Sequence, residues 1–206
     1  MSQTGAAVTT VRRGRPRSES SRQAILRAAG ELLLEQGLGG TSIEAVSRLA
    51  GTSKATIYRW WPSKELLAVD VLLAEWHDEA TSAEDTGTLA GDLRAVILPW
   101  TRDLRSRPYA RIVSGLVAAA LGDEDFAHDY RARFVERRRE RGRAALARAA
   151  ARGEIPADTD VELALDMLYG PIYHRLLHGH EEVDEPFAEQ VIAAVVRAVA
   201  PGSSAG

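Results

Sequence analysis

The stretch from Thr41 to Lys64, TSIEAVSRLAGTSKATIYRWWPSK, constrains what this chain can fold into more than any other stretch. Apolar residues recur at helical spacing ahead of Gly51, where a helix that must turn sharply needs a residue tolerant of positive φ. A second short run extends from Lys54 to Trp60, and Pro62 stops it. Helix, glycine turn and helix form the outline of a helix-turn-helix, whose second helix enters the major groove of DNA.

The first of these helices carries a start signal and an apolar face. Thr41 and Glu44 stand three residues apart, so we expect a capping box in which each side chain bonds the other residue's amide. Ile43, Val46 and Leu49 follow at steps of three and are expected on the buried face. Many helical hairpins also turn at a glycine, so the pattern alone leaves a purely structural role open.

The second helix places hydrogen-bonding groups on its outer side. Ala55 and Ile57 form a small inner face, and Trp60 with Trp61 ends the helix in a large apolar anchor. The outward residues can donate hydrogen bonds to phosphates or base edges. They are Thr52, Ser53, Lys54, Thr56, Tyr58 and Arg59.

With its continuation, TSIEAVSRLAGTSKATIYRWWPSKELLAVDVL resembles the DNA-binding domain of the tetracycline-repressor (TetR) family of regulators. The resemblance spans roughly Ser18 to Leu73. It implies that Tyr58 and Lys64 hold DNA phosphates, while residues around Ser53, Lys54, Thr56 and Arg59 face the groove. Where the family often has His or Tyr followed by Phe, this chain has two tryptophans, and Trp61 suits the same apolar anchor.

Charge is distributed unevenly along the chain. Residues 1–64 hold ten Lys and Arg against four Asp and Glu, a net of +6, and residues 65–206 hold sixteen against twenty-five, a net of −9, which together give the overall −3. A basic head on an acidic body is expected when only one end meets a polyanion.

Residues 1–17 are expected to form a flexible basic arm. Gly14 and Pro16 separate its arginines, which disfavours a helix, and such arms reach along phosphates or into an A·T-rich minor groove. A solubilising tail is the alternative. The full set of residues expected to contact DNA is Arg12, Arg13, Arg15, Arg17, Thr41, Ser42, Thr52, Ser53, Lys54, Thr56, Tyr58, Arg59, Trp60 and Lys64.

Composition excludes several classes of protein. The chain of 206 residues is 45% hydrophobic and 27% charged, as in globular proteins. It has no cysteine, which excludes disulfides, thiolate zinc sites and a cysteine nucleophile. No apolar run is long enough to span a bilayer and no signal-peptide core is visible, so we expect a cytoplasmic protein without a membrane partner.

The expected fold is all-α in two parts. A first helix runs from Ser20 or Ser21 to Gln36 and ends at Gly37, completing a three-helix head over 18–64. Ser63 caps a linking helix over 63–80, and the polar stretch 81–91 is the expected boundary. The body, 81–206, is expected to bind a ligand and to dimerise. Its helices are expected at about 88–105, 108–121, 123–152, 158–178 and 185–199.

An arginine-rich segment in the body resembles a second nucleic-acid site at first sight. Seven arginines lie between Arg131 and Arg143, with Glu136 and Glu140 interleaved. Mixed charges on a long helix are typical of a solvated face, and Phe126, Tyr130 and Phe134 would form the inner stripe, so we expect a surface helix.

The last two helices are the most apolar of the body. The family resemblance implies that they pair with those of a second copy in a four-helix dimer interface, which would place two reader helices about one DNA turn apart on a near-palindromic site. Pro171 should kink the first of them or force a new start. The expected interface residues are Leu165, Leu168, Ile172, Leu176, Val191 and Val195.

The sequence therefore predicts a homodimeric transcriptional regulator. It is expected to bind double-stranded DNA as a repressor and to respond to a small apolar or amphipathic effector. In the family, the ligand shifts the balance between two body conformations, moves the fourth helix and changes the spacing of the heads. The expected pocket residues, each of which also suits a plain core position, are Trp100, Leu104, Leu116, Met167, Tyr169 and Tyr173.

Enzyme chemistry has little support. His174 and His178 lie one turn apart with His180 nearby, but no third ligand is fixed by spacing, so we expect the polar end of a helix, no metal and no cofactor. No nucleophile elbow or phosphate-binding glycine loop is present. Two rivals remain: a helical protein–protein adaptor, which would lack salt-dependent DNA affinity, and a metal-dependent enzyme that uses the histidines.

Overall fold

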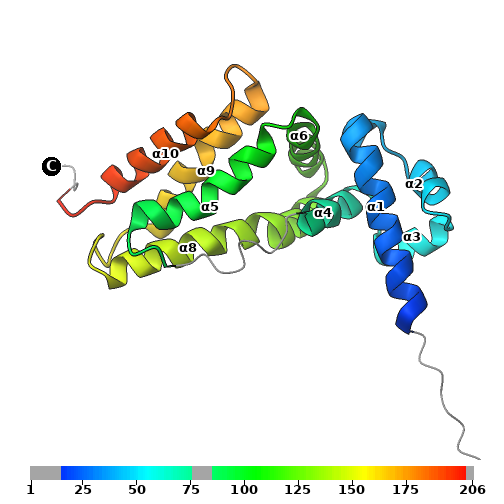
Figure 1. The fold of residues 1–206 in the computed structure, drawn as a ribbon, viewed down its shortest axis with the longest axis horizontal. Helices are drawn as coiled ribbons and strands as arrows, with labels where there is room; N and C mark the ends of the chain where they lie inside the picture. The colour runs from blue at the N-terminus through cyan, green and yellow to red at the C-terminus, as the bar shows by residue number, and fades with distance from the viewer. Residues whose placement is uncertain (1–14, 76–84, 203–206) are drawn as a thin grey trace, which may run out of the picture.

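The computed structural model describes residues 15–75 and 85–202, and every regular element within these ranges is helical (Figure 1). This confirms the all-α fold with a helix-turn-helix head and a helical body. None of the described helices has the length and apolar character needed to cross a bilayer. The elements are α1 (Arg15–Gly40), α2 (Ile43–Leu49), α3 (Lys54–Trp60), α4 (Lys64–Glu75), α5 (Leu89–Leu104), α6 (Arg107–Gly122), α7 (Glu124–Tyr130), the π-helical turn η2 (Arg131–Val135), α8 (Glu136–Ala151), α9 (Val161–His178) and α10 (Glu185–Ala198).

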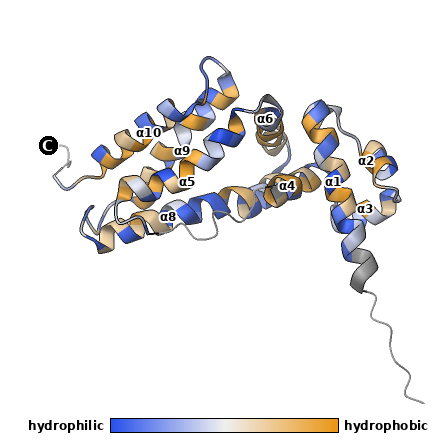
Figure 2. Ribbon diagram, viewed as in Figure 1, coloured by the Kyte–Doolittle hydropathy of each residue, from blue (hydrophilic) through white to orange (hydrophobic). Residues whose placement is uncertain are grey.

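The head closes around an apolar core that α1 shares with α2 and α3, the two helices of the helix-turn-helix. Ile25 and Ala29 of α1 are fully buried, as are Val46 of α2 and Ile57 of α3. Trp61, just after α3, is 1% exposed and serves as the expected anchor. Figure 2 shows the apolar stripe of α4 continuing towards the body. Burial of the apolar side of α4 fixes the position of α3 relative to the rest of the head.

The first helix differs from the expectation at both ends. It begins at Arg15 rather than at Ser20 or Ser21, so the last three residues of the expected arm are helical. Gly37 has a φ of 70° and interrupts the helix where a stop was expected, but helical structure resumes as far as Gly40. Arg12 and Arg13 lie outside the described residues.

The start of α2 corrects the expected capping box. Ser42, not Thr41, is the N-cap, and its hydroxyl accepts a hydrogen bond from the Ala45 amide at 3.1 Å. Thr41 is buried and donates its hydroxyl to the Gly37 carbonyl at 2.8 Å, which closes the kink at the end of α1. Leu49 is 52% exposed rather than buried. Each residue turns a helix by about 100°, so a second step of three carries Leu49 about 120° away from Ile43.

The second reader helix and the linking helix form as predicted. Ser53 caps α3 by accepting from the Thr56 amide at 3.2 Å. Trp61 is extended, as the residue before a proline should be, and ends α3. Ser63 accepts from the Leu66 amide at 3.2 Å and caps α4. The described part of α4 ends at Glu75, and the rest of the expected linking helix, 76–80, lies outside the described residues.

The body is a bundle in which α10 packs on α5 and α9 while α8 packs on α5 and α9 (Figure 1). A buried polar cluster joins the start of α5 to the end of α8. Asp92 of α5 is fully buried and accepts from the backbone and hydroxyl of Thr86, both at 2.8 Å. It also accepts from Arg148 at 3.1 Å and Arg152 at 3.2 Å of α8.

Head and body meet through α1, α4 and α6. α1 packs on both α4 and α6, and α4 packs on α7. At this contact Gly115 of α6 faces Leu38 of α1 so closely that a Cβ on Gly115 would come within 3.1 Å of the leucine Cβ. The head is therefore seated directly on the body helices.

The body helices follow the expected ranges with two refinements. The helix expected over 123–152 is present as an unbroken helical stretch from Glu124 to Ala151, within which Arg131–Val135 forms the π-helical turn η2. The fresh start that was one expected outcome at Pro171 does not occur, because α9 runs without a break from Val161 to His178. The residue before Pro171 is Gly170, which has no Cβ to clash with the proline ring, and this removes one cause of the usual break.

Candidate nucleic-acid interface and body cavity

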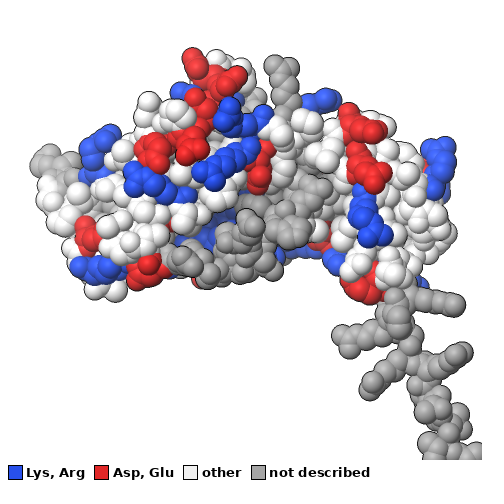
Figure 3. Space-filling view, in the orientation of Figure 1, with Lys and Arg blue, Asp and Glu red and all other residues white. Residues whose placement is uncertain are grey.

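The outer side of α3 carries the residues expected to read DNA. Tyr58 is 49% exposed, Trp60 is 38% exposed, and Ser53, Lys54 and Arg59 are also exposed. Ile57 faces inwards and is fully buried, so the helix presents one polar side and one apolar side. On the face shown in Figure 3, acidic and basic side chains intermingle over both the head and the body. The arrangement lets the polar side of α3 meet the edge of a groove while Ile57 stays in the core, although Trp60 and Ala55 are exposed.

Lys54 of α3 is held by an ion pair to α2. Its Nζ lies 2.7 Å from Oε1 of Glu44 on α2. The hydrogen bond from Lys54 lowers the pKa of the Glu44 carboxyl group, and the same bond raises the pKa of Lys54. Both groups are solvent-exposed, so the pair is easily exchanged for a phosphate or base contact.

Several neighbouring hydroxyl and carbonyl groups are already hydrogen-bonded inside the motif. The hydroxyls of Ser53 and Thr56 lie 2.9 Å apart, and the Thr52 carbonyl accepts from the Ser47 hydroxyl at 2.6 Å. These bonds hold the turn and the start of α3 in one geometry. Ser53 has both a capping role and an exposed position.

Five of the residues expected at DNA have other surroundings in this structure. Thr41 is 3% exposed and lies inside the head, which corrects its assignment to DNA. Ser42 is exposed but acts as the cap of α2. Lys64 donates its Nζ proton to the Leu38 carbonyl at 2.8 Å, towards α1. The backbone of Arg15 and Arg17 belongs to the first turns of α1.

Asp70 of α4 joins the reader helix to the body, and sequence reasoning missed it. Its carboxylate accepts from Nε1 of Trp61 at 2.8 Å and pairs with Arg22 of α1 at 3.3 Å. Its other oxygen pairs with Arg133 of the π-helical turn. The available signal was a single acid inside the apolar run LLAVDVLL, where a charge needs partners.

A cavity of about 230 Å³ opens between α8 and α9 in the body. Tyr169 and Tyr173, both expected at the pocket, line it, and Trp100 contacts both rings at centroid distances of 5.8 and 5.3 Å. The other side chains at its wall are Val135, Arg138, Arg139 and Asp166.

The remaining residues expected at the pocket lie elsewhere. Leu104 and Leu116 are core residues, 5% and 0% exposed. Met167 is 36% exposed and borders a different hollow near the start of α9 and the end of α10. Two of the six expected residues, Tyr169 and Tyr173, thus line the cavity, and a third, Trp100, packs against both of their rings.

The arginine-rich segment forms a helix with an exposed face, as expected, and Arg138 is the one of its arginines that is buried. It is 4% exposed, and its guanidinium lies over the rings of Trp100 at 4.2 Å and Phe134 at 4.3 Å. Phe126, Tyr130 and Phe134 form the buried stripe as predicted. Arg138 continues the same step of four, and this was the signal that placed it inside.

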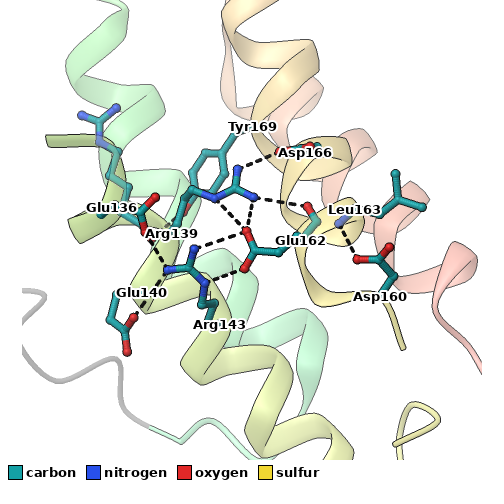
Figure 4. Close-up of polar contacts among 10 residues, drawn as sticks. Glu136, Arg139, Glu140, Arg143, Asp160, Glu162, Leu163, Asp166 and Tyr169 are labelled. Carbon is teal, nitrogen blue, oxygen red and sulfur yellow. Dashed lines mark hydrogen bonds and ion pairs between the residues drawn. The ribbon is translucent and has the colours of Figure 1, made fainter. Parts of the chain in front are cut away.

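An arginine–glutamate cluster holds α8 against α9 beside the cavity (Figure 4). Arg139 pairs with Asp166 at 2.7 Å and with Glu162 at 2.5 Å, and Arg143 pairs with Glu162 at 2.6 Å. Hydrogen bonds from Arg143 first and Arg139 second lower the pKa of Glu162 to about 2. Close packing supports the cluster, because a Cβ on Gly142 would meet Leu165 at 2.4 Å.

The residues expected at the dimer interface are mostly internal to the subunit. Leu165, Leu168 and Ile172 are fully buried, and Val191 and Val195 are at most 6% exposed, whereas Leu176 is half-buried. The opposite face of α9 is the accessible one. Its exposed residues are Leu163, Met167, Gly170, His174 and Leu177.

The three histidines at the end of α9 come together at the surface. The ring centroid of His174 lies 4.6 Å from that of His178 and 5.1 Å from that of His180. Among the residues that the structure describes, no group of three or more His, Cys, Asp or Glu side chains has an arrangement able to hold a metal ion.

Comparison with known protein families gives two matches that divide the chain. Residues 25–71 match the model described as "Bacterial regulatory proteins, tetR family". Residues 83–195 match the model described as "Tetracyclin repressor-like, C-terminal domain". The first match covers the reader helices and the second covers the cavity.

Individual relatives are similar in sequence to this chain over most of its length. The "uncharacterized HTH-type transcriptional regulator YdeS" of Bacillus subtilis is 35% identical, over 88% of this chain and 90% of that protein. The "DNA-binding transcriptional repressor TetR" of Mycobacteroides abscessus is 32% identical, over 85% of this chain and 92% of that protein. The crystal structure of the TetR family regulator SCO0332 has a TM-score of 0.72 and 38% identity, and the match covers 88% of this chain and all of that one.

Proposed function

The chain belongs to the tetracycline-repressor (TetR) family and is a DNA-binding transcriptional regulator, and from this premise we propose that it is a ligand-responsive repressor acting as a homodimer on a near-palindromic operator. The exposed polar side of α3 is the observation that carries the proposal. The M. abscessus relative is described as a repressor, which supports repression as the mode of control. Membership of this family favours a regulator over the adaptor and enzyme alternatives.

The proposed DNA contacts divide into two kinds. Lys54 and Arg59 are exposed on α3 and can read base edges, because both are long and can donate several hydrogen bonds. Tyr58 is placed to donate its hydroxyl to a phosphate, which positions the helix without reading sequence. Ser53, Thr56 and Trp60 lie at the same surface, and the arm residues from Arg12 to Arg17 are proposed to add phosphate contacts.

The proposed dimer uses the outer face of α9. Leu163, Met167 and Leu177 are exposed apolar residues on that face, and they are the kind of surface that a partner subunit covers. On the neighbouring α10, Ala194 and Ala198 are exposed and small, so a second copy can approach closely. A two-fold pairing of this face replaces the internal residues first expected at the interface.

The proposed coupling between effector and operator runs through α4. Val135 at the cavity wall and Arg133 at Asp70 belong to the same π-helical turn. A ligand that changes this turn would change the Arg133–Asp70 contact, and Asp70 also holds Trp61 at the end of α3. Ligand binding would then shift the heads between two spacings, only one of which fits the operator.

The proposed division of labour follows the sequence. Residues 18–64 form the DNA-binding domain, α4 links it to the body, and residues 81–206 form the effector-binding and dimerisation domain. We place the protein in the cytoplasm, where its DNA and a diffusible effector are both present.

The test is selection of bound sequences from random duplex DNA by the wild type, Lys54→Ala and Tyr58→Phe. The wild type should enrich a near-palindromic consensus. Lys54→Ala should relax the consensus at particular positions, because a base-reading group is lost. Tyr58→Phe should weaken all sites alike by about 1 kcal/mol, because one hydrogen bond to a phosphate is lost.

The selection is run at low salt with the folded dimer confirmed by sedimentation. Absence of any enriched sequence under those conditions would reject the sequence-specific regulator and favour a protein–protein adaptor. Enrichment of a single half-site would retain DNA reading but contradict the homodimer.

A further inference from the structure

A further hollow, of about 460 Å³, lies where the head meets the body. It is bordered by α1 and α4 of the head and by the π-helical turn η2 and the start of α8 of the body. It shares no wall residue with the cavity between α8 and α9. The residues that form the wall of this junction hollow are Arg22, Asp70, Leu73, Ala74, Arg133 and Arg137.

One carboxylate brings two of the three arginines together. Asp70, whose side chain is 11% exposed, pairs through Oδ2 with Arg22 at 3.3 Å and through Oδ1 with Arg133. The two guanidinium groups therefore reach Asp70 from α1 and from η2, and they are held near each other before any ligand arrives. Both arginine side chains still meet solvent, because they are 33% and 38% exposed.

Arg137 adds a third cation to the same wall. It is exposed, and it forms no ion pair within the ranges that the structure describes. Three positive charges at the junction hollow therefore face the single negative charge of Asp70, which leaves a surplus of two. Glu19 pairs with Arg22 only at 3.9 Å and does not border the hollow. The hollow is thus suited to an anion that carries more than one charge.

The type of cation indicates the type of anion. Guanidinium groups match the geometry of phosphate oxygens and bind them through charge-assisted, often bidentate hydrogen bonds. A phosphomonoester has a second pKa of about 6, so at neutral pH it is mostly a dianion. Leu73 and Ala74 add apolar surface at the same wall, against which the carbon part of an ester can pack.

We propose that the junction hollow binds the phosphate group of a small phosphomonoester, with the phosphate oxygens on Arg22, Arg133 and Arg137. The bound phosphate joins α1 of the head to η2 and α8 of the body. Arg22 also lies over the ring of Trp61, at 5.6 Å from its centroid, so the joined helix contacts the residue that ends α3. This inference goes beyond the proposed function, because it adds a second ligand site and a second input to the position of the head.

The experiment compares a dianion with a monoanion of nearly equal shape on the full-length protein. Phenyl phosphate and its diester, methyl phenyl phosphate, are titrated by calorimetry at millimolar concentrations, with chloride used to hold the ionic strength constant. Phenyl phosphate should bind about tenfold more tightly than the diester, because it offers one more charged oxygen to the arginines. Inorganic phosphate is titrated alongside and should bind more weakly than phenyl phosphate, since it has no carbon part to pack on Leu73.

Variants at one exposed position locate the site. Arg137→Met should weaken the binding of phenyl phosphate by about tenfold, and Arg137→Lys, which keeps the charge but not the fork, should retain part of the affinity. Arg131→Met is the matched control, because Arg131 is an exposed arginine of η2 that does not border the hollow. Without ligand, the melting temperature of Arg137→Met should equal that of the wild type, since no ion pair is removed.

A separate measurement tests the joining of head and body. Amide hydrogen exchange in α1 should slow by about tenfold when phenyl phosphate is present at ten times its dissociation constant, because any opening that separates α1 from α8 must release the ligand. The same total concentration of ligand should have a much smaller effect in Arg137→Met. Unchanged exchange in α1 of the saturated wild type would overturn the joining role.

The other outcomes are equally decisive. Equal binding of monoester and diester, no binding of phenyl phosphate, or an affinity that is unchanged in Arg137→Met would overturn the site, as would an equal loss in Arg131→Met. Inorganic phosphate that binds as tightly as phenyl phosphate would overturn the assignment to an ester and leave free phosphate as the ligand. These measurements contain no DNA, so a failure of the wild type to bind an operator would count against the proposed regulator and not against the phosphate site.

Discussion

Lys54 and Glu44 decide how much positive charge the reader helix offers to DNA. In the structure they neutralise each other across α2 and α3 at 2.7 Å. Glu44 is exposed on the side that faces the nucleic acid in the proposed complex, so it also brings a negative charge close to the phosphates. In the proposed complex Glu44 therefore limits the affinity of the protein for DNA of any sequence, so that selectivity comes from the base contacts.

Replacing Glu44 by Gln should strengthen DNA binding by about threefold at low salt, because Lys54 is released and a repulsive charge is removed. The dissociation constant for the selected operator, measured by fluorescence anisotropy across a salt series, checks this. Glu181→Gln, which removes another exposed acid, in the loop after α9, should leave the constant unchanged. Weaker binding by Glu44→Gln would show that the ion pair orients Lys54 rather than restraining it.

Asp92 is the residue on which acid stability of the body should depend. Burial alone would raise the pKa of its carboxyl group, but hydrogen bonds from Thr86, Arg148 and Arg152 outweigh it and hold the pKa below the ordinary 3.8. The charged form is thus favoured by folding. Its contribution is complete above pH 3.8 and is lost as the pH falls through the lower, folded-state value.

Asp92→Asn should lower the free energy of unfolding by about 3 kcal/mol at neutral pH, because Arg148 and Arg152 lose their shared carboxylate. The difference from the wild type should shrink in acid below the ordinary carboxyl pKa. Urea unfolding followed by circular dichroism between pH 7 and about pH 2.5 tests both statements. A difference independent of pH would mean that Asp92 is not the group that titrates.

At the scale of elements, α4 is a connector fastened at both sides. Asp70 holds Trp61 and Arg22 of the head and Arg133 of the π-helical turn. A π-helical turn inside an otherwise α-helical stretch is a frequent mark of a functional site, because the extra residue can be absorbed or released. Its place between the cavity and Asp70 suits the transmission of a small change.

Asp70→Asn and Arg133→Met should each loosen the head while leaving the body intact. Amide hydrogen exchange in α3 should rise by about tenfold, since the charged hydrogen bonds that hold Trp61 and α1 are weakened. Exchange in α9 and α10 should not change. Arg131→Met, in the same turn but exposed, is the control and should behave as the wild type. Equal acceleration in head and body would reveal general destabilisation and no special connection.

At the scale of the whole molecule, α9 has apolar residues on both sides. Leu165 and Leu168 face the core, and Leu163 and Met167 face outwards. In a monomer the outer residues would stay exposed to water, and pairing with a second copy would bury them. The spacing of the two heads then depends on this face.

The double replacement Leu163→Glu with Met167→Glu should raise the dissociation constant of the dimer by about a hundredfold, because charges would be buried against apolar surface. Sedimentation velocity over a range of concentrations measures this, and operator binding should weaken in parallel. Leu121→Glu is the matched control, because Leu121 is 87% exposed at the end of α6. A double variant that stays dimeric would place the interface elsewhere.

The sequence alone determined the features that depend on neighbours along the chain. The cap at Ser53, the interruption at Gly37 and the end of α3 before Pro62 follow from local hydrogen bonding and backbone sterics. Helix positions and the buried stripe at Phe126, Tyr130 and Phe134 follow from periodicity. The DNA-reading surface of α3 was predicted in the same way and stays a prediction for each residue.

The tertiary structure decided what periodicity leaves ambiguous. Both faces of α9 are apolar, and only its packing against α8 and α10 selects the inner one. The contact of Asp70 with Arg133 joins residues 63 positions apart, and the burial of Arg138 depends on Trp100 arriving from α5. Such contacts form when helices pack, because their free energy comes from groups that are distant in the sequence and meet only in the folded chain.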